Sequence, residues 1–283
     1  MEKYELTNES IVIKDDTKLY RIRALKDFSD VKKGDLGGYI EKEENLSHDG
    51  DCWVYDNAKV YDNAKIYSNA TVKDNAIVGD NAKVGDNAYV YACARVYGDS
   101  KVYGDAMVGG RCQIYGNARV YENVQIYNRA MIYGDAMVCG DCIVSEKAKV
   151  YGHAKVCDNA WISDNAEVGG NARVYGNANV YDNACIYGNA KVYGDAIVSE
   201  NAKIGNNAEI YGDAQVYEDA EVYGNAKVYG TASISEHAKI GENAKIYGHA
   251  WIHGNAKVYG NAKINNNMEI CGITKIHGNE DGR

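Results

Sequence analysis

The chain contains no proline and only one phenylalanine among its 283 residues. It contains instead 30 glycines and 25 tyrosines, together with abundant Asn, Asp and Ala. This composition does not resemble that of an ordinary mixed globular core. A bias of this kind indicates internal repeats.

The sequence also lacks an apolar run near the length needed to span a bilayer. Its start, MEKYELTNES, has neither the apolar region of a secretory signal nor an Arg-rich amphipathic leader. These absences predict a cytoplasmic protein without membrane attachment. The net charge of -9 argues against bulk attraction to nucleic acid or anionic lipid, so we expect neither as a partner.

A six-residue repeat occupies most of the chain. Val or Ile stands at every sixth position from Val54 to Ile276 without insertion or deletion, and a small residue, usually Ala, lies two positions before it. A period of six does not fit an α-helix of 3.6 residues per turn, and β-branched residues and Gly-Asn pairs oppose a helix. Short strands that alternate inward and outward, separated by tight Asn, Asp or Gly corners, fit the repeat. The repeat therefore predicts a parallel β-helix.

The segment VGDNAKVGDNAYV resembles the motif of the left-handed β-helix family. This resemblance implies that three hexapeptides form one triangular coil of eighteen residues, which gives roughly 12 coils between residues 54 and 276. We therefore predict an all-β fold, a single left-handed parallel β-helix with a small N-terminal β cap. The predicted organisation is a capping segment at 1–47, the β-helix at 48–276 and a short tail at 277–283.

The N-terminal segment departs from the repeat. SIVIKDDTKLYRIRAL predicts two alternating strands about a polar turn, which would cover the first coil. The stretch LYRIRALKDFSDVKKGDLGGYIEKEENLS resembles the N-terminal segment of YdcK-like β-helix proteins of bacteria, phages and prophages. A transferase activity has been suggested for that family, but the resemblance brings no active site with it.

Residues eighteen apart should stack in columns on the outside of such a coil. One outward column contains all three tryptophans and no Lys or Arg, whereas another is almost entirely basic. A flat apolar strip of this size usually marks an interface. The predicted binding face and its flanking tyrosines comprise Trp53, Tyr89, Met107, Ile143, Trp161, Tyr181, Ile197, Tyr217 and Trp251.

A resemblance to hexapeptide acyltransferases implies a catalytic histidine that acts as general base, and an acyl-CoA groove between subunits. His253, on the flat face beside Trp251, is the weak candidate for this base, and acetyl-CoA is a cofactor only under this alternative. No metal site is expected, because Cys139 and Cys142 of the CGDC motif fall on opposite sides of the coil wall. Cys139 and Cys157 fall in one outward column, and we expect both to be reduced.

The sequence supports two hypotheses about function. The favoured hypothesis is a non-catalytic scaffold that works through the Trp-bearing face, either by self-association into a dimer or trimer or by capture of a protein or small molecule in a phage-related role. The alternative is a hexapeptide-type acyltransferase with His253 near an intersubunit groove.

Overall fold

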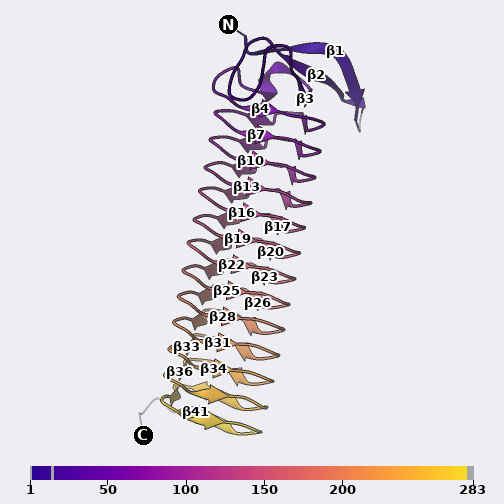
Figure 1. Ribbon diagram of the computed structural model, residues 1–283. Coiled ribbons are helices and arrows are strands. Elements are labelled where there is room, and N and C mark those ends of the chain that lie inside the picture. The colour runs from indigo at the N-terminus through magenta and orange to yellow at the C-terminus, as the bar shows by residue number, and fades with distance from the viewer. Residues whose placement is uncertain (1, 14–15, 279–283) are drawn as a thin grey trace. The chain divides into compact units, whose positions relative to one another are not determined.

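The computed structural model describes residues 2–13 and 16–278. The chain divides into two compact units, Met1–Gly140 and Asp141–Arg283, and each is described by itself. Within each unit, short strands succeed one another along three faces of a repeating coil (Figure 1). Each strand of the repeat contains an outward residue followed by the inward Val or Ile.

Unit 1 holds three sheets whose neighbouring strands in the repeat are parallel. The first contains β1 (Tyr4–Val12), β2 (Lys18–Ala24), β3 (Leu36–Ile40), β5 (Lys59–Val60), β8 (Ile77–Val78), β11 (Arg95–Val96), β14 (Gln113–Ile114) and β17 (Met131–Ile132). The second contains β4 (Trp53–Val54), β7 (Thr71–Val72), β10 (Tyr89–Val90), β13 (Met107–Val108) and β16 (Gln125–Ile126). The third contains β6 (Lys65–Ile66), β9 (Lys83–Val84), β12 (Lys101–Val102), β15 (Arg119–Val120) and β18 (Met137–Val138).

Unit 2 continues the same pattern. Its first sheet contains β20 (Lys149–Val150), β23 (Glu167–Val168), β26 (Cys185–Ile186), β29 (Lys203–Ile204), β32 (Glu221–Val222), β35 (Lys239–Ile240), β38 (Lys257–Gly260) and β41 (Lys275–Gly278). The second contains β19 (Ile143–Val144), β22 (Trp161–Ile162), β25 (Asn179–Val180), β28 (Ile197–Val198), β31 (Gln215–Val216), β34 (Ser233–Ile234), β37 (Trp251–Ile252) and β40 (Glu269–Ile270). The third contains β21 (Lys155–Val156), β24 (Arg173–Val174), β27 (Lys191–Val192), β30 (Glu209–Ile210), β33 (Lys227–Val228), β36 (Lys245–Ile246) and β39 (Lys263–Ile264).

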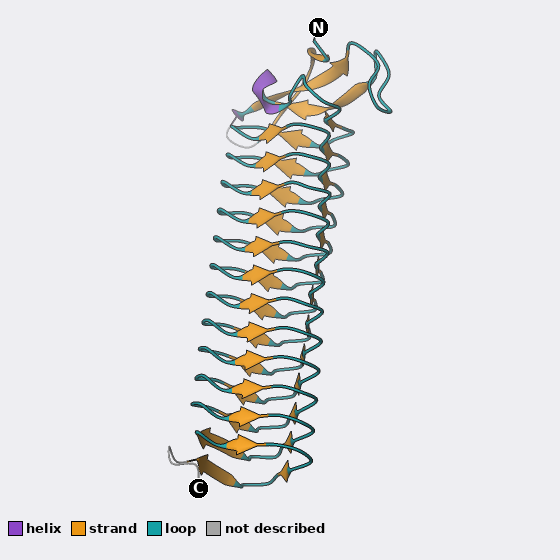
Figure 2. Cartoon of the chain, turned by 90° about the vertical axis from the view of Figure 1, so that its left-hand side faces the viewer, coloured by secondary structure: helices purple, strands orange, loops and turns teal. Residues whose placement is uncertain are grey.

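The strand register confirms the eighteen-residue period. β10 pairs with β13 so that Tyr89 lies opposite Met107 and Val90 opposite Val108. Each inward residue therefore stacks on the equivalent residue of the next coil, as the strands of one face do in Figure 2. The inward Val, Ile and Ala positions, such as Val90 and Ala88, are fully buried. Their removal from water is the main stabilising contribution to each unit.

The corners explain the Asp-Asn and Gly-Asn pairs of the sequence. The first residue of each pair adopts the left-handed backbone conformation, for example Asp56 with φ 53° and Gly116 with φ 72°. Glycine, Asn and Asp tolerate this conformation better than other residues. Corner carboxylates also accept a hydrogen bond from the amide one coil further on, as Asp62 Oδ2 does from the Asp80 amide at 3.2 Å. The acidic side chains at the corners therefore already act as hydrogen-bond acceptors for backbone amides.

The N-terminal segment caps the first coils of unit 1. β1 and β2 form the antiparallel hairpin expected from the sequence, although its turn residues 14 and 15 lie outside the described residues. β3 then joins the repeat through a parallel pairing with β5 and is followed by a short 3-10 helix, η2 (Glu43–Asn45). Lys3 is buried, and its ammonium donates to the Cys52 carbonyl at 2.9 Å and approaches Cys52 Sγ at 3.3 Å.

At the other end of the chain, β41 (Lys275–Gly278) pairs with β38. The predicted tail at 277–283 thus begins inside a strand, and residues 279–283 lie outside the described residues. The domain boundaries at 47 and 276 stay predictions.

The predicted fold class is confirmed: the chain is an all-β left-handed parallel β-helix with three hexapeptides per coil and an N-terminal β cap. In the part of the chain that the structure describes, no helix is long and apolar enough to cross a membrane.

Candidate functional site

The most chemically varied group of side chains lies on the last two coils of the Trp-bearing face in unit 2. β37 and β40 pair in parallel, which sets Trp251 opposite Glu269. His253 directly follows β37 and continues the pairing through its amide, which donates to the Ile270 carbonyl at 3.0 Å. The parallel register places Cys271 in the same column, one coil beyond His253. The four outward side chains therefore form one patch.

The imidazole of His253 is held on both edges by carboxylates. Its Nε2 lies 2.9 Å from Glu269 Oε1, and its Nδ1 lies 3.5 Å from Glu236 Oε1. The Trp251 ring stacks on the imidazole with centroids 4.1 Å apart. As a result only 17% of the histidine side chain is exposed, whereas the two glutamates are at least half exposed. The orientation of the imidazole is therefore fixed, and the ring remains partly exposed to solvent.

This arrangement supplies the acid partner that the sequence did not assign to any histidine. A carboxylate at one ring nitrogen fixes the tautomer and orients the ring, which leaves the other nitrogen to accept a proton or to bind a metal. Glu236 comes from a corner one coil before His253, and Glu269 from the strand one coil after it. Only the stacking of coils brings them to the same imidazole.

Two other histidines that lie near carboxylates are more exposed than His253. His237 and His277 have side chains 63% and 64% exposed and lie 3.5 and 3.7 Å from Asp219 and Glu242. His48 belongs to the cap, where it stacks on Tyr4 and accepts a hydrogen bond from the Lys3 amide. His253 is therefore more buried than His237 and His277.

One predicted binding-face residue does not lie on the surface. Trp53 is 1% exposed, because Tyr4 and Phe28 pack edge-on against its ring at 6.0 and 5.3 Å. The approach of the cap depends on Gly37, where a Cβ would lie 2.7 Å from Trp53 Cζ2. The prediction that Trp53 contributes to a binding surface is therefore wrong, since the cap covers the first coil.

The remaining residues of the predicted face are at least partly accessible. Trp161, Trp251 and Met107 are 49%, 43% and 42% exposed. The others are half-buried: Tyr89, Ile143, Tyr181, Ile197 and Tyr217. In unit 2 the face carries Trp161 and Trp251 on the same column, five coils apart, with Ile197 between them.

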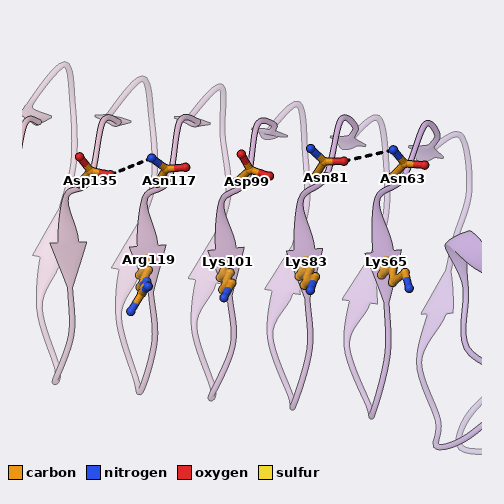
Figure 3. Close-up of a pocket in the computed structure, with 9 residues that line it drawn as sticks. All are labelled: Asn63, Lys65, Asn81, Lys83, Asp99, Lys101, Asn117, Arg119 and Asp135. Atoms are coloured by element: carbon orange, nitrogen blue, oxygen red, sulfur yellow. Dashed lines mark hydrogen bonds between the residues drawn. The ribbon is translucent and has the colours of Figure 1, made fainter.

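The basic column of unit 1 lines an open groove of about 780 Å³ (Figure 3). Lys65, Lys83, Lys101 and Arg119 form one row of exposed cations at the strand spacing. A second row of corner residues runs beside them, in which Asn63 and Asn81 are joined at 3.1 Å, and Asn117 donates to Asp135 at 2.8 Å. In unit 2 the same column is partly neutralised, because Lys191 and Lys227 both bind Glu209, at 3.0 and 2.8 Å.

The eight cysteines lie in different environments. Cys52, Cys112 and Cys142 are buried, Cys185 is half-buried, and Cys93 and Cys271 are exposed. Cys139 and Cys157 are each disulfide-bonded, so the expectation that both are reduced is wrong. Cys142 is fully buried, and Cys139 is only 8% exposed.

The rates of thiol alkylation at pH 8 should distinguish the buried cysteines from the exposed ones. Burial raises the pKa of Cys112 to about 12, and its Sγ lies 2.7 Å from the Gly109 carbonyl. Its thiolate fraction at pH 8 is therefore about 10⁻⁴. We expect iodoacetamide to modify Cys93 and Cys271 at least 100-fold faster than Cys112, as followed by peptide mass spectrometry, and this difference should vanish in denaturant. Equal rates in the folded protein would contradict the burial of Cys112.

The repeat, the three-stranded coil and the cap over its first turn define a β-helix protein of hexapeptide repeats. Four segments match the YdcK β-solenoid repeat: residues 113–128, 124–140, 130–146 and 184–200. The chain is also 39% identical over 67 residues to the uncharacterized acetyltransferase YdcK of Escherichia coli strain K12. That match covers 21% of this chain and 21% of the relative. These findings confirm the predicted resemblance to YdcK-like β-helix proteins over part of the chain.

A similar solved structure is that of the UDP-N-acetylglucosamine acyltransferase of Francisella novicida. The TM-score is 0.47 with 16% sequence identity, and the superposition covers 59% of this chain and 65% of that one.

Proposed function

We propose that the protein is a hexapeptide-type acyltransferase in which His253 is the general base. The observation that carries this proposal is the environment of the imidazole, which has a carboxylate at each ring nitrogen and an indole against its face. The relative's description as an acetyltransferase agrees with it, although that match covers only a fifth of the relative. This proposal replaces the non-catalytic scaffold that the sequence alone favoured.

The reaction requires one proton to move twice. One ring nitrogen of His253 takes the proton of an acceptor hydroxyl or amine, and the acceptor oxygen or nitrogen attacks the thioester carbonyl of acetyl-CoA. The carbon–sulfur bond then breaks, and the imidazolium returns its proton to the departing CoA thiolate. The carboxylate at the other ring nitrogen stabilises the imidazolium between these two transfers.

Glu269 is the partner that an acceptor would displace. It contacts Nε2, and 58% of its side chain is exposed, so the carboxylate can rotate into solvent without loss of packing. Glu236 would then remain at Nδ1 and keep the ring oriented. On this proposal the thioester lies in an intersubunit groove, and a second copy of the chain closes the patch around Trp251.

Incubation of the wild-type protein with acetyl-CoA tests the proposal. Calorimetry should detect acetyl-CoA binding, and mass spectrometry should detect transfer to at least one member of a panel of amines and sugar hydroxyls. Release of CoA thiol gives an independent rate. Absence of both acetyl-CoA binding and transfer above the uncatalysed rate would overturn the proposal.

A second candidate function rests on the exposed tryptophans of unit 2. Trp161 and Trp251 are 49% and 43% exposed on one column, and large exposed aromatic side chains are typical of interfaces. We propose that this face carries self-association into a dimer or trimer. This proposal is compatible with catalysis, because Trp251 lies beside His253.

Substitution of Trp161 tests the interface. Trp161→Lys places a charge on the face without touching a buried position, so we expect the oligomer to dissociate at least tenfold more readily in light scattering. Trp161→Phe, which keeps an aromatic ring, is the matched control and should retain the mass of the wild type. An unchanged mass for Trp161→Lys, or a monomeric wild type, would refute the interface.

A further inference from the structure

We propose that His253, Glu269 and Cys271 form a binding site for one divalent cation of the zinc type. One ring nitrogen, one carboxylate oxygen and the thiol sulfur of these residues lie within 4.8 Å of one another. The nitrogen on the side of Glu269 is Nε2, which is 2.9 Å from Glu269 Oε1. The binding itself does not depend on the proposed acyl transfer.

The donor set matches the chemistry of zinc. A neutral imidazole, a thiolate and a carboxylate are the three ligand types that Zn²⁺ accepts, and three protein ligands leave a fourth position for water. Bonds of about 2.0–2.3 Å require ligand atoms about 3.3–3.6 Å apart in a tetrahedral site. The exposed side chains of Glu269 and Cys271 can make that adjustment by rotation, because packing constrains neither of them.

The surroundings of His253 resemble the outer shell of a metal site. A metal-bound imidazole usually donates its other N–H to a carboxylate, which fixes the tautomer. Glu236 Oε1 lies 3.5 Å from Nδ1, on the edge of the ring opposite to the proposed ligands. Trp251 stacks on the imidazole at 4.1 Å and limits its rotation. The orientation of the imidazole is therefore fixed without a bound metal.

The charges of the patch also favour a cation. Among the described residues, the ion-pair contacts of Glu236 and Glu269 are with His253 alone, so no Lys or Arg neutralises these carboxylates. By contrast, Glu167, Glu209 and Glu221 on other faces of the same unit each bind a lysine. The side chains of two glutamates, a histidine and a cysteine thus lie together. A bound cation would neutralise the negative charge of the carboxylates.

Metal binding has a consequence for the proposed reaction. The bound cation takes the lone pair of Nε2 and releases the thiol proton of Cys271 to solvent. A histidine so engaged cannot accept a proton from an acyl acceptor. Zinc occupancy should therefore inhibit acyl transfer, and Cys271→Ser should relieve this inhibition while it leaves His253 in place.

The test uses the full chain after treatment with a chelator. Titration with Co²⁺ should give one equivalent with the visible absorption of a tetrahedral site and a near-ultraviolet thiolate-to-cobalt band, and Zn²⁺ should displace it. Cys271→Ser should abolish the thiolate band and weaken Zn²⁺ binding in calorimetry at least tenfold, as should His253→Ala. Glu236→Gln should weaken it by about 10- to 100-fold, the range found for outer-shell partners.

Two variants serve as controls. Cys93→Ser removes another exposed thiol, and His237→Ala removes another histidine beside a carboxylate, so both should bind Zn²⁺ as the wild type does. Loss of the site in Cys271→Ser with an unchanged circular dichroism spectrum supports the proposal. Absence of a thiolate band in the wild type, or equal Zn²⁺ affinity in Cys271→Ser and wild type, overturns it. Neither outcome depends on whether acyl transfer occurs.

Discussion

Replacement of Val222 with aspartate is expected to lower the free energy of unfolding of unit 2 by at least about 4 kcal/mol. Val222 is fully buried in β32, where it stacks between Ile204 and Ile240. The substitution loses about 1.5–3 kcal/mol of apolar burial and introduces a carboxyl group that has no partner there. Because a repeat contacts only its neighbours, the damage should spread from β32 along the unit.

The control is the preceding residue on the same strand. Glu221 points outward and forms an ion pair with Lys239 at 3.0 Å, with side chains 34% and 37% exposed. Glu221→Gln should therefore cost less than about 1 kcal/mol, as is usual for such pairs. Urea unfolding followed by circular dichroism measures both variants. Similar losses at the two positions would contradict the inward and outward assignment.

Replacement of His253 with alanine should lower kcat for acyl transfer by about 10²- to 10⁴-fold, the contribution usual for general base catalysis. In the proposed mechanism the imidazole contacts the reacting proton and other groups hold the thioester, so the KM for acetyl-CoA should change little. Initial rates of CoA release, measured with saturating acceptor, give both constants. Because His253 is on the outer surface, the melting temperature should stay within a few degrees of that of the wild type.

His237→Ala provides the comparison for this effect. His237 also lies near a carboxylate, Asp219 at 3.5 Å, but 63% of its side chain is exposed. We expect its activity to equal that of the wild type. If both variants lose activity equally, or if His253→Ala retains the wild-type rate, His253 is not the base.

The repeat in the sequence was sufficient to predict the fold. Val or Ile at every sixth position and Ala two residues earlier define which side chains point inward, and a strand has no alternative register that buries them. The eighteen-residue columns follow from three such hexapeptides per coil, which the resemblance to the left-handed β-helix family implies, so the basic row Lys65, Lys83, Lys101 and Arg119 and the tryptophan column could both be predicted. Local geometry decides these features, because each position repeats the same backbone conformation.

The sequence predicted a cap over the first coil, but it did not determine which side chains the cap buries or which side chains meet across coils. Trp53 belongs to the apolar column by periodicity, yet Tyr4 and Phe28 bury it, because the cap follows no repeat and its path depends on tertiary packing. Likewise, Glu236 and His253 are 17 residues apart, and His253 and Glu269 are 16 apart. Neither separation equals the eighteen-residue period, and both contacts depend on the rotamers of long side chains.

The sequence by itself therefore determined the β-helix, its three faces and the identity of the weak candidate base. Tertiary structure alone decided that His253 has carboxylate partners, that Cys271 lies near enough to share a cation with it, and that Trp53 is not on the surface. The physical reason is that backbone periodicity fixes where each Cβ points, whereas the contacts of a charged or aromatic side chain depend on neighbours that belong to other coils or to the cap.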